Sequence, residues 1–218
     1  SSCRPAVNYY LLATWPKDAL APGAIVDVAD HQKHLIGQAF SASKSPIALR
    51  LITKKAEAID AKFFRARIEA AWKRRDSLFN RDAFRVVHGE ADLLPGVFVD
   101  RYGDALTLQT LSEGASVRRE ELARLLLEVT GLKTVVLRDD ASGREWEGLP
   151  REKRVLLGSG ATVTRYHEGE NVFEIDLLND AKTGSFLDQL DNHVRAGELA
   201  RGEALDTFSY HGGFALAL

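Results

Sequence analysis

The middle of the chain reads FRVVHGEADLLPGVFVDRYGD from Phe84 to Asp104. Apolar and β-branched residues gather at Phe84–Val87 and Val97–Asp100, and the turn-forming residues of Asp92–Gly96 separate the two runs. Short runs of this kind between turn residues are typical of β-strands. A second turn and the run Leu106–Leu111 follow. The stretch therefore predicts three consecutive strands joined by turns, and the other predicted elements flank it.

The residues before this stretch predict a small β-rich unit followed by one amphipathic helix. Asp60 suits the N-cap of the helix, because a carboxylate there accepts hydrogen bonds from free backbone N–H groups. The basic run Lys73-Arg74-Arg75 suits its C-terminal end, because cations offset the negative end of the helix dipole. The predicted strands are Ala24–Asp30, Leu35–Phe40 and Ile47–Thr53, and the apolar stripe of the helix is Phe64, Ile68, Ala71 and Trp72.

The residues after the stretch predict alternating helices and strands. The predicted helices are Arg119–Thr130 and about Asp188–Ala200, the strands are Thr134–Arg138, Val155–Leu157, Val172–Asp176 and Ala204–Phe208, and Asp139–Arg154 is a loop. A helix, a strand and then Gly212-Gly213 is the order in which a doubly wound α/β domain begins. A single parallel strand cannot bury both of its faces, so we expect the chain to be the front part of a longer protein.

Composition indicates an ordinary globular protein. Of the 218 residues, 45% are hydrophobic and 28% are charged, and the net charge is −2, which argues against disorder and against a basic field over the whole molecule. The single cysteine, Cys3, excludes an internal disulfide and a Cys-rich zinc site, and we expect no metal. No apolar run is long enough for a membrane span, so we expect no membrane association and a cytoplasmic location.

Although the net charge of the whole chain is near zero, one segment of it is strongly basic. Between Lys44 and Arg85 there are 12 basic and 5 acidic residues, a net charge of +7. Clustered basic residues beside a small β unit with nearby aromatics suit contact with a phosphate backbone. A solvated helix face with its aromatics in the core explains the same pattern, and both interpretations stay open. The candidate RNA-binding residues are Lys44, Arg50, Lys73, Arg74 and Arg75.

Glycine-rich motifs give little further information. Neither G-x-G-x-x-G nor G-x-x-x-x-G-K-[ST] occurs in the chain, so neither common nucleotide-binding fingerprint is present. The residues from Asp206 to Gly213 form either a turn that brings backbone close to a small charged ligand or a plain tight turn.

Three blocks of sequence resemble one known family. They are Phe84 to Asp104, then Lys182-Thr183-Gly184 with Phe186-Leu187-Asp188-Gln189, and finally Leu205 to Tyr210 followed by Gly212-Gly213-Phe214. In this order and spacing they closely resemble the bacterial 23S ribosomal RNA methyltransferase I-like family. The resemblance extends over nearly the whole chain from about Pro22 onward.

The resemblance implies a multidomain fold of the α/β and α+β classes. It implies a PUA-like RNA-binding domain over residues 1–57, a central α+β domain over 58–176, and the truncated start of a Rossmann-like methyltransferase domain over 177–218. The implied cofactor is S-adenosylmethionine (SAM), whose sulfonium and ammonium suit a carboxylate and aromatic faces. The cofactor-binding residues implied by the resemblance are Lys182, Phe186, Gln189, Asp206, Phe208, Tyr210 and Gly212.

The chain also departs from the family's usual pattern. Ala181, Ser185, Leu190 and His193 stand where the family often has Gln, Phe, Arg and Arg, and a His-Pro-Trp-like block is degraded around Trp15. The resemblance implies that the catalytic residues, including a cysteine, lie beyond Leu218, so we expect no catalytic residue within the chain.

The expected function is SAM-dependent methylation of ribosomal RNA, with cytosine carbon-5 as the favoured target. That chemistry requires a thiolate to attack carbon-6 of an unstacked base. The expected partner is ribosomal RNA, and the oligomeric state is open, with a homodimer as one option. The alternative is a non-catalytic RNA-binding module built from the PUA-like and central domains. The missing glycine fingerprint disfavours a third interpretation, a nicotinamide-dependent oxidoreductase.

Overall fold

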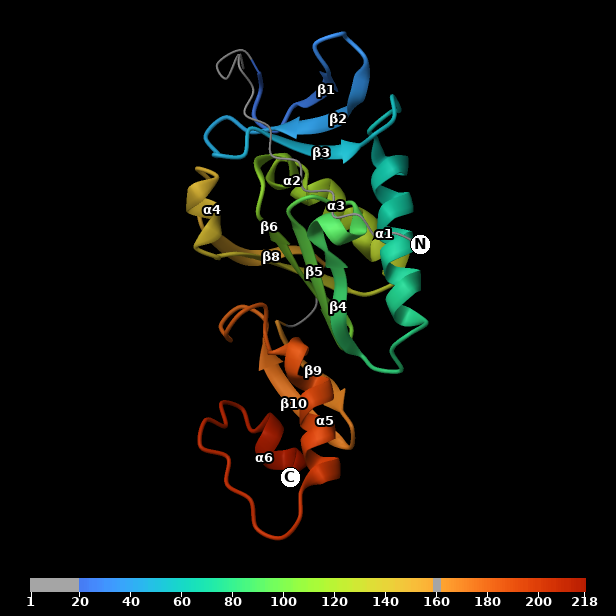
Figure 1. Cartoon of the computed structure of the whole chain (residues 1–218). Coiled ribbons are helices and arrows are strands. Elements are labelled where there is room, and N and C mark those ends of the chain that lie inside the picture. The colour runs from blue at the N-terminus through green and yellow to red at the C-terminus, as the bar shows by residue number, and fades with distance from the viewer. Residues whose placement is uncertain (1–19, 159–161) are drawn as a thin grey trace.

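The computed structural model describes residues 20–158 and 162–218, and these contain three β-sheets. Figure 1 shows a small sheet, a five-stranded sheet and a hairpin following one another along the molecule. The predictions for Cys3 and Trp15 lie outside the described residues. The strands are β1 (Ile25–Ala29), β2 (Leu35–Ser41), β3 (Leu49–Thr53), β4 (Ala83–His88), β5 (Val97–Tyr102), β6 (Ala105–Thr110), β7 (Thr134–Asp139), β8 (Glu152–Gly158), β9 (Val163–Glu168) and β10 (Asn171–Asp176). The helices are α1 (Ala61–Asp76), α2 (Glu113–Ser116), α3 (Arg119–Thr130), α4 (Gly143–Trp146), α5 (Leu190–Leu199) and α6 (Gly213–Ala217), with 3₁₀ helices η2 (Gly89–Asp92) and η3 (Leu187–Gln189).

The first sheet is antiparallel, in the order β1-β2-β3, and packs against the central part of the molecule. Phe40 of β2 is buried in the same apolar cluster as Phe64 of α1. Gly114 permits this approach, because a Cβ at that position would lie 2.2 Å from the Phe40 ring. The carboxylate of Glu113 accepts hydrogen bonds from the backbone N and the Oγ of Ser43, each at 2.7 Å. Apolar contact and polar contact therefore both fix the first sheet to α2.

Helix α1 forms as its sequence predicts. The Asp60 carboxylate accepts hydrogen bonds from the backbone N of Lys62 and of Phe63, at 3.0 and 3.1 Å. The N-cap side chain thus satisfies two donors that have no partner within the helix. The buried stripe is Phe64, Ile68 and Ala71, and the basic residues Lys73, Arg74 and Arg75 occupy the last turn.

The central sheet has the strand order β4-β5-β6-β7-β8. Its pairings are antiparallel except for β6 with β7, which are parallel and are connected through α2 and α3. Helix α3 ends at Gly131, whose φ of 70° lies in the left-handed region that favours glycine. Helices α1 and α3 lie together on one face of this sheet (Figure 1), and one apolar cluster fills the space between them. This arrangement confirms the predicted central strands and the two helices predicted before and after them, which are α1 and α3.

The hairpin of β9 and β10 was predicted only in part, because the sequence indicated a single strand over Val172–Asp176. Strand β9 reads VTRYHE, and its polar residues hide the strand pattern. Its buried ring, Tyr166, stacks on Phe173 of β10 with ring centroids 5.5 Å apart, and both rings join Tyr102 of the central sheet in a second cluster. The hairpin therefore buries one face against the end of the five-stranded sheet.

One prediction for the last forty residues was wrong. No strand forms at Ala204–Phe208, because none of the described residues pairs with it and an isolated strand leaves its backbone groups without ladder partners. Figure 1 shows this segment as a loop between α5 and α6. The helix predicted from about Asp188 forms as α5, preceded by η3, and the Asp188 carboxylate in η3 accepts hydrogen bonds from Lys182 Nζ and Gln189 Nε2.

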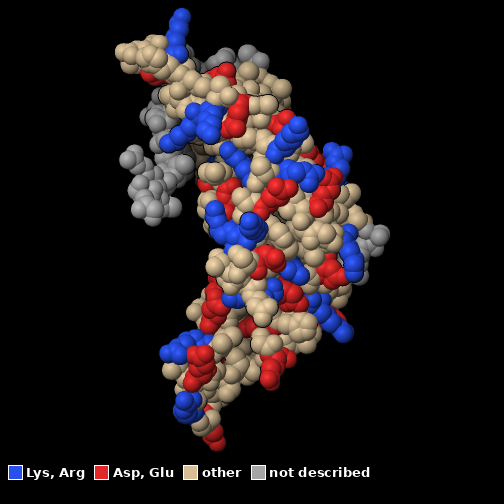
Figure 2. Space-filling view, turned by 90° about the vertical axis from the view of Figure 1, so that its right-hand side faces the viewer, with Lys and Arg blue, Asp and Glu red and all other residues tan. Residues whose placement is uncertain are grey.

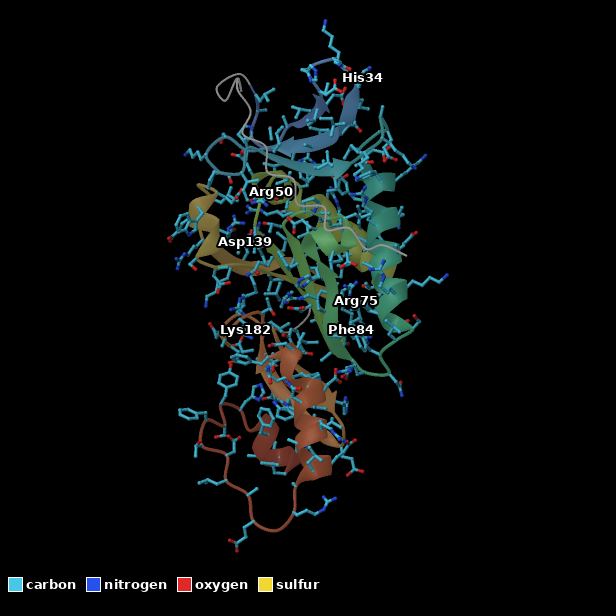
Figure 3. All side chains as sticks on the ribbon, viewed as in Figure 1. His34, Arg50, Arg75, Phe84, Asp139 and Lys182 are labelled. Carbon is cyan, nitrogen blue, oxygen red and sulfur yellow. The ribbon has the colours of Figure 1, made fainter. Side chains whose placement is uncertain are left out.

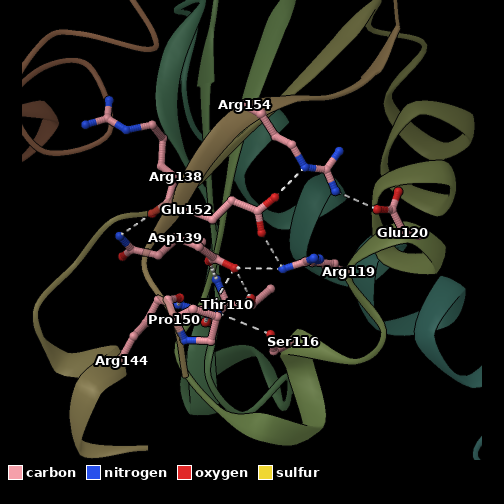
Figure 4. Close-up of polar contacts among 11 residues, drawn as sticks. Thr110, Ser116, Arg119, Glu120, Arg138, Asp139, Arg144, Pro150, Glu152 and Arg154 are labelled. Carbon is pink, nitrogen blue, oxygen red and sulfur yellow. Dashed lines mark hydrogen bonds and ion pairs between the residues drawn. The ribbon is translucent and has the colours of Figure 1, made fainter. Parts of the chain in front are cut away.

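The predicted loop Asp139–Arg154 is more ordered than expected, because a buried ion pair organises it (Figure 4). Asp139 and Arg144 are both fully buried, with Oδ2 and Nη1 2.9 Å apart. The Asp139 carboxylate also accepts from Thr110 N and Thr110 Oγ1, each at 2.6 Å. Arg144 donates from Nε to the carbonyl of Pro150 at 2.9 Å. Burial raises the pKa of Asp139, so the adjacent guanidinium is needed to keep a charge there.

We predict that Arg144→Met lowers the free energy of unfolding by about 3–5 kcal/mol, because it removes the nearer of the two cations that pair with the buried Asp139 carboxylate and leaves Arg119, at 4.0 Å. Urea unfolding measures this loss. The matched control is Arg124→Met on the exposed side of α3, which should change stability by less than about 0.5 kcal/mol. Equal unfolding midpoints for the two variants would contradict the role given to the buried pair.

Candidate functional site

The segment Lys182–Gln189 lies where the hairpin and α5 meet the lower end of the central sheet. Thr183 donates from Oγ1 to Asp100 Oδ2 at 2.6 Å, and the backbone N of Ser185 donates to the hydroxyl of Tyr102 at 3.0 Å. Asp100 and Tyr102 both belong to β5, so two successive anchors hold the segment against a single strand. Burial raises the pKa of Tyr102, which keeps its hydroxyl protonated.

Ser185 connects the segment to two further elements. Its Oγ lies 2.9 Å from the hydroxyl of Tyr166 in β9 and 2.7 Å from Nε2 of His211 in the turn before α6. Ser185 itself is buried. The serine therefore forms a polar junction at the centre of the site.

Gly184 is required by the geometry of the segment. Its φ is 143°, and a Cβ there would lie 3.0 Å from Ile175 Cδ1 and 3.2 Å from the Tyr102 ring. The neighbouring Lys182 also has a positive φ, of 54°. Thr183 and Ser185 point inward on either side of a residue that has no room for a side chain, so the sequence Thr-Gly-Ser fits the site through both its hydroxyls and its glycine.

Asp100 joins this segment to Arg85 on the adjacent strand. The carboxylate is 1% exposed and receives Arg85 Nε on Oδ1 at 2.7 Å and Arg85 Nη2 on Oδ2 at 2.9 Å. Two parallel bonds between a guanidinium and a carboxylate fix both the position and the plane of the arginine. Asp100 thus binds Arg85 and Thr183 together.

A cleft of about 720 Å³ opens beside these residues. Figure 3 shows Lys182 at the level of Phe84 and Arg75, where the C-terminal segment meets the strands of the sheet. The walls are mainly cationic and aromatic, with two acids on the side of the C-terminal segment. They include Arg75, Arg81, Arg85, His88 and Lys182, the rings of Phe79 and Phe84, and Asp188 and Asp191.

Three of the predicted cofactor residues lie on the segment itself. Lys182 lines the cleft, with Nζ 3.2 Å from Asp188 and 3.8 Å from the centroid of the Phe186 ring. Gln189 donates to Asp188 at 3.3 Å and accepts from Asn192 at 3.0 Å, so its amide interacts with its neighbours.

The other four predicted cofactor residues lie on the loop before α6, and the structure brings only some of them to the segment. Tyr210 contacts Phe186, with ring centroids 5.2 Å apart. Asp206 Oδ2 is buried and has no hydrogen-bond partner in the described part of the chain, which fits a site for a ligand's ammonium or hydroxyl groups. Gly212, with a φ of 87°, is the N-cap of α6. Phe208 is 95% exposed, so in this structure it lines no site.

The predicted RNA-binding residues differ in whether their charge is already paired with a carboxylate. Arg75 forms two hydrogen bonds to the buried Asp92, at 2.8 and 2.9 Å, and Arg74 reaches the same carboxylate at 3.2 Å. Arg50 pairs with the buried Glu147 at 2.7 Å. Lys44 and Lys73 are exposed. On the face shown in Figure 2, basic and acidic side chains alternate without one continuous basic area.

Five residues that form one network were not predicted as site residues: Arg85, Asp100, Thr183, Ser185 and His211. Arg85 and Asp100 are direct cross-strand partners in the β4–β5 register. Opposite charges on two neighbouring predicted strands are a sequence signal for a cross-strand ion pair, and this signal could have identified the contact. The contact of Tyr102 with Ser185 joins residues 83 positions apart, and no local pattern predicts it.

Over residues 20–158 and 162–218, no group of three or more His, Cys, Asp or Glu side chains is arranged to hold a metal ion. In the same ranges, no helix has the length and apolar character needed to cross a membrane.

We predict that His211 titrates below its ordinary value of 6.5, because burial disfavours its charged form. The unfolded chain then binds a proton more readily than the folded one, so the stability contributed by His211 is complete above pH 6.5 and decreases as pH falls below it. NMR titration of the imidazole measures the pKa directly. Between pH 7.5 and pH 5.5, the free energy of unfolding should decrease less in His211→Asn than in the unsubstituted protein. An imidazole pKa above 6.5 would contradict the prediction.

Comparisons with known proteins agree with this architecture. A model of the PUA-like domain matches residues 7–54. Ribosomal RNA large subunit methyltransferase I from Yersinia pseudotuberculosis and from Yersinia pestis are each 36% identical over 207 residues, which is 92% of this chain and 52% of the relative. The chain thus spans about half the length of the curated relatives it matches.

Solved structures share the fold. A putative SAM-dependent methyltransferase from Streptococcus mutans matches with a TM-score of 0.72 and 19% identity, over 90% of this chain and 52% of its own. The structure of SMU.776, a putative methyltransferase complexed with SAH, matches with a TM-score of 0.72 and 18% identity, over 92% of this chain and 52% of its own. These likenesses confirm the multidomain fold that the sequence predicts. By its sequence the chain is similar to the ribosomal RNA large subunit methyltransferase I proteins along about half of their length.

Proposed function

We propose that this chain functions as part of a SAM-dependent methyltransferase that acts on ribosomal RNA. The observation that carries the proposal is the 36% identity over 207 residues to proteins named for that activity. The structure adds physical support, because a glycine-containing segment is anchored beside a cationic cleft large enough for a nucleotide. The ribosomal RNA substrate is consistent with action in the cytoplasm.

We assign a separate role to each of three proposed domains, in their order along the chain. Residues 1–57 form the PUA-like RNA-binding domain, residues 58–176 the central α+β domain, and residues 177–218 the beginning of the cofactor domain. Lys44, Arg50, Lys73, Arg74 and Arg75 are the proposed RNA contacts of the first two. Lys44 and Lys73 are the most available, because the three arginines already have carboxylate partners.

The proposed cofactor contacts are Lys182, Phe186, Gln189, Asp206, Phe208, Tyr210 and Gly212. SAM supplies the methyl group. Asp206 offers an unpaired carboxylate oxygen to a hydroxyl or ammonium, and Phe186 with Tyr210 offers aromatic faces to a sulfonium. Phe208 requires a rearrangement of the loop before α6 to reach the same ligand, since its side chain faces solvent.

The atom that we propose is methylated is carbon-5 of a cytosine, as the resemblance implies. In that reaction the chain's own residues bind and orient RNA and cofactor, and the attacking group is a cysteine thiolate. The target base must leave its stack to reach the cofactor, and a cleft beside the cofactor segment is where an extruded nucleotide fits.

We predict that the whole protein binds SAH and that Asp206→Ala weakens binding at least tenfold, about 1.4 kcal/mol, because the variant removes the unpaired oxygen. Calorimetry with SAH measures both affinities. Asp76→Ala, an exposed acid at the end of α1, is the matched control and should bind as tightly as the unsubstituted protein.

Methyl transfer from labelled SAM to ribosomal RNA completes the test. Incorporation at cytosine carbon-5 supports the proposal in full. Tight RNA binding without SAH binding or methyl transfer would replace it with the non-catalytic RNA-binding module.

A further inference from the structure

Asp100 binds one edge of the Arg85 guanidinium, and the N–H groups on the other edge are left to bind a ligand in the cleft. Nε and Nη2 of Arg85 are both used by Asp100. The remaining nitrogen, Nη1, lies 3.3 Å from Nδ1 of His88, another residue of the cleft wall. A guanidinium carries five N–H groups, so pairing with one carboxylate leaves donors for a second anion. Because Asp100 is 1% exposed, it orients Arg85 without presenting a carboxylate to the cleft.

Two of the other basic side chains of the cleft are also placed to bind an anion. Arg75 is engaged by the buried Asp92, whereas Arg81 and Lys182 pair with the acids of the cleft wall, Asp191 and Asp188. Asp191 and Asp188 are 82% and 66% exposed where they pair with Arg81 and Lys182. Ion pairs this exposed are weak, and a phosphate group competes for the same cations.

We infer that Arg85, with Arg81 and Lys182, forms a site for a backbone phosphate of the substrate RNA in this cleft. The inference rests on the proposed function, from which it takes RNA as the substrate. The aromatic rings of Phe79 and Phe84 on the same walls offer apolar surface to the nucleotide that carries the phosphate. Arg85 and Arg81 are not among the RNA-binding residues proposed from the sequence, and Lys182 was proposed there as a cofactor contact.

The location of the site connects RNA binding with the proposed cofactor segment. Thr183 and Ser185 line the same cleft as Arg85, and Thr183 shares the Asp100 carboxylate with it. A phosphate held by Arg85 therefore brings the adjacent nucleotide against the segment Lys182–Gln189. Asp100 acts as a positioning residue for both, since it is too buried to contact RNA itself.

The test is the affinity of the whole protein for a ribosomal RNA fragment, measured by fluorescence anisotropy at several KCl concentrations. The informative variant is the double substitution Arg85→Gln with Asp100→Asn, which removes both charges together and leaves no unpaired buried carboxylate. It should lower RNA affinity about tenfold at low salt and reduce the slope of log affinity against log salt by about 0.7 to 0.9 for the lost contact. Arg85→Lys should retain most of the salt slope, because it keeps the charge.

Arg165→Gln is the matched control, an arginine that also pairs with a carboxylate, Glu174, on the exposed hairpin. It should leave RNA affinity and salt slope unchanged. Thermal unfolding of each variant confirms that it is folded.

An unchanged salt slope and affinity in the folded double variant would overturn the inference. A loss of SAH affinity with RNA affinity intact would also overturn it, by assigning the cleft to an anionic group of the cofactor. Failure of the unsubstituted protein to bind ribosomal RNA at all would instead refute the proposed function, so the two failures are distinguishable.

Discussion

The buried carboxylate of Asp100 is the constraint on which the site depends. A carboxylate that is 1% exposed is strongly unfavourable unless its oxygens are paired. Arg85 from β4 supplies two N–H groups, and Thr183 from a segment 83 residues further on supplies a hydroxyl. The need to satisfy one charge therefore fixes the arginine, the cleft wall and the Lys182–Gln189 segment in one arrangement.

The same principle joins the other parts of the molecule. Asp139 holds Arg144 and the end of β6, Glu147 holds Arg50 and Ser45, and Glu113 holds Ser43. Glu113 and Glu147 receive donors from residues 43–50, far away in sequence, whereas Asp139 receives donors from Thr110 and Arg144 within the central part of the chain. Apolar contact across the joints, such as Phe40 against Gly114, excludes water around these bonds. The sheets are thus linked through paired charges as well as through shared apolar clusters.

The elements that local sequence predicts are those whose stability is decided locally. Helix α1 has its N-cap and its stripe within one stretch of chain, and the central strands have β-branched runs between turns. Strand β9 was missed because its polar residues hide a one-sided pattern, and Ala204–Phe208 was wrongly predicted because a strand requires a neighbour that propensity does not reveal. For the site, the family blocks identified the Lys182–Gln189 segment, but Ser185 with Tyr166 and His211 depends on folding of distant residues.

The central claim is that Asp100 anchors the segment through Thr183. Hydrogen exchange of the Ser185 backbone amide, which donates to the Tyr102 hydroxyl, measures that anchoring in the unsubstituted protein and in Thr183→Val. Valine keeps the size of threonine and removes only the hydroxyl. The account predicts faster exchange of the Ser185 amide in the variant, with the amides of β5 and β6 unchanged. Unchanged protection of Ser185 would contradict it.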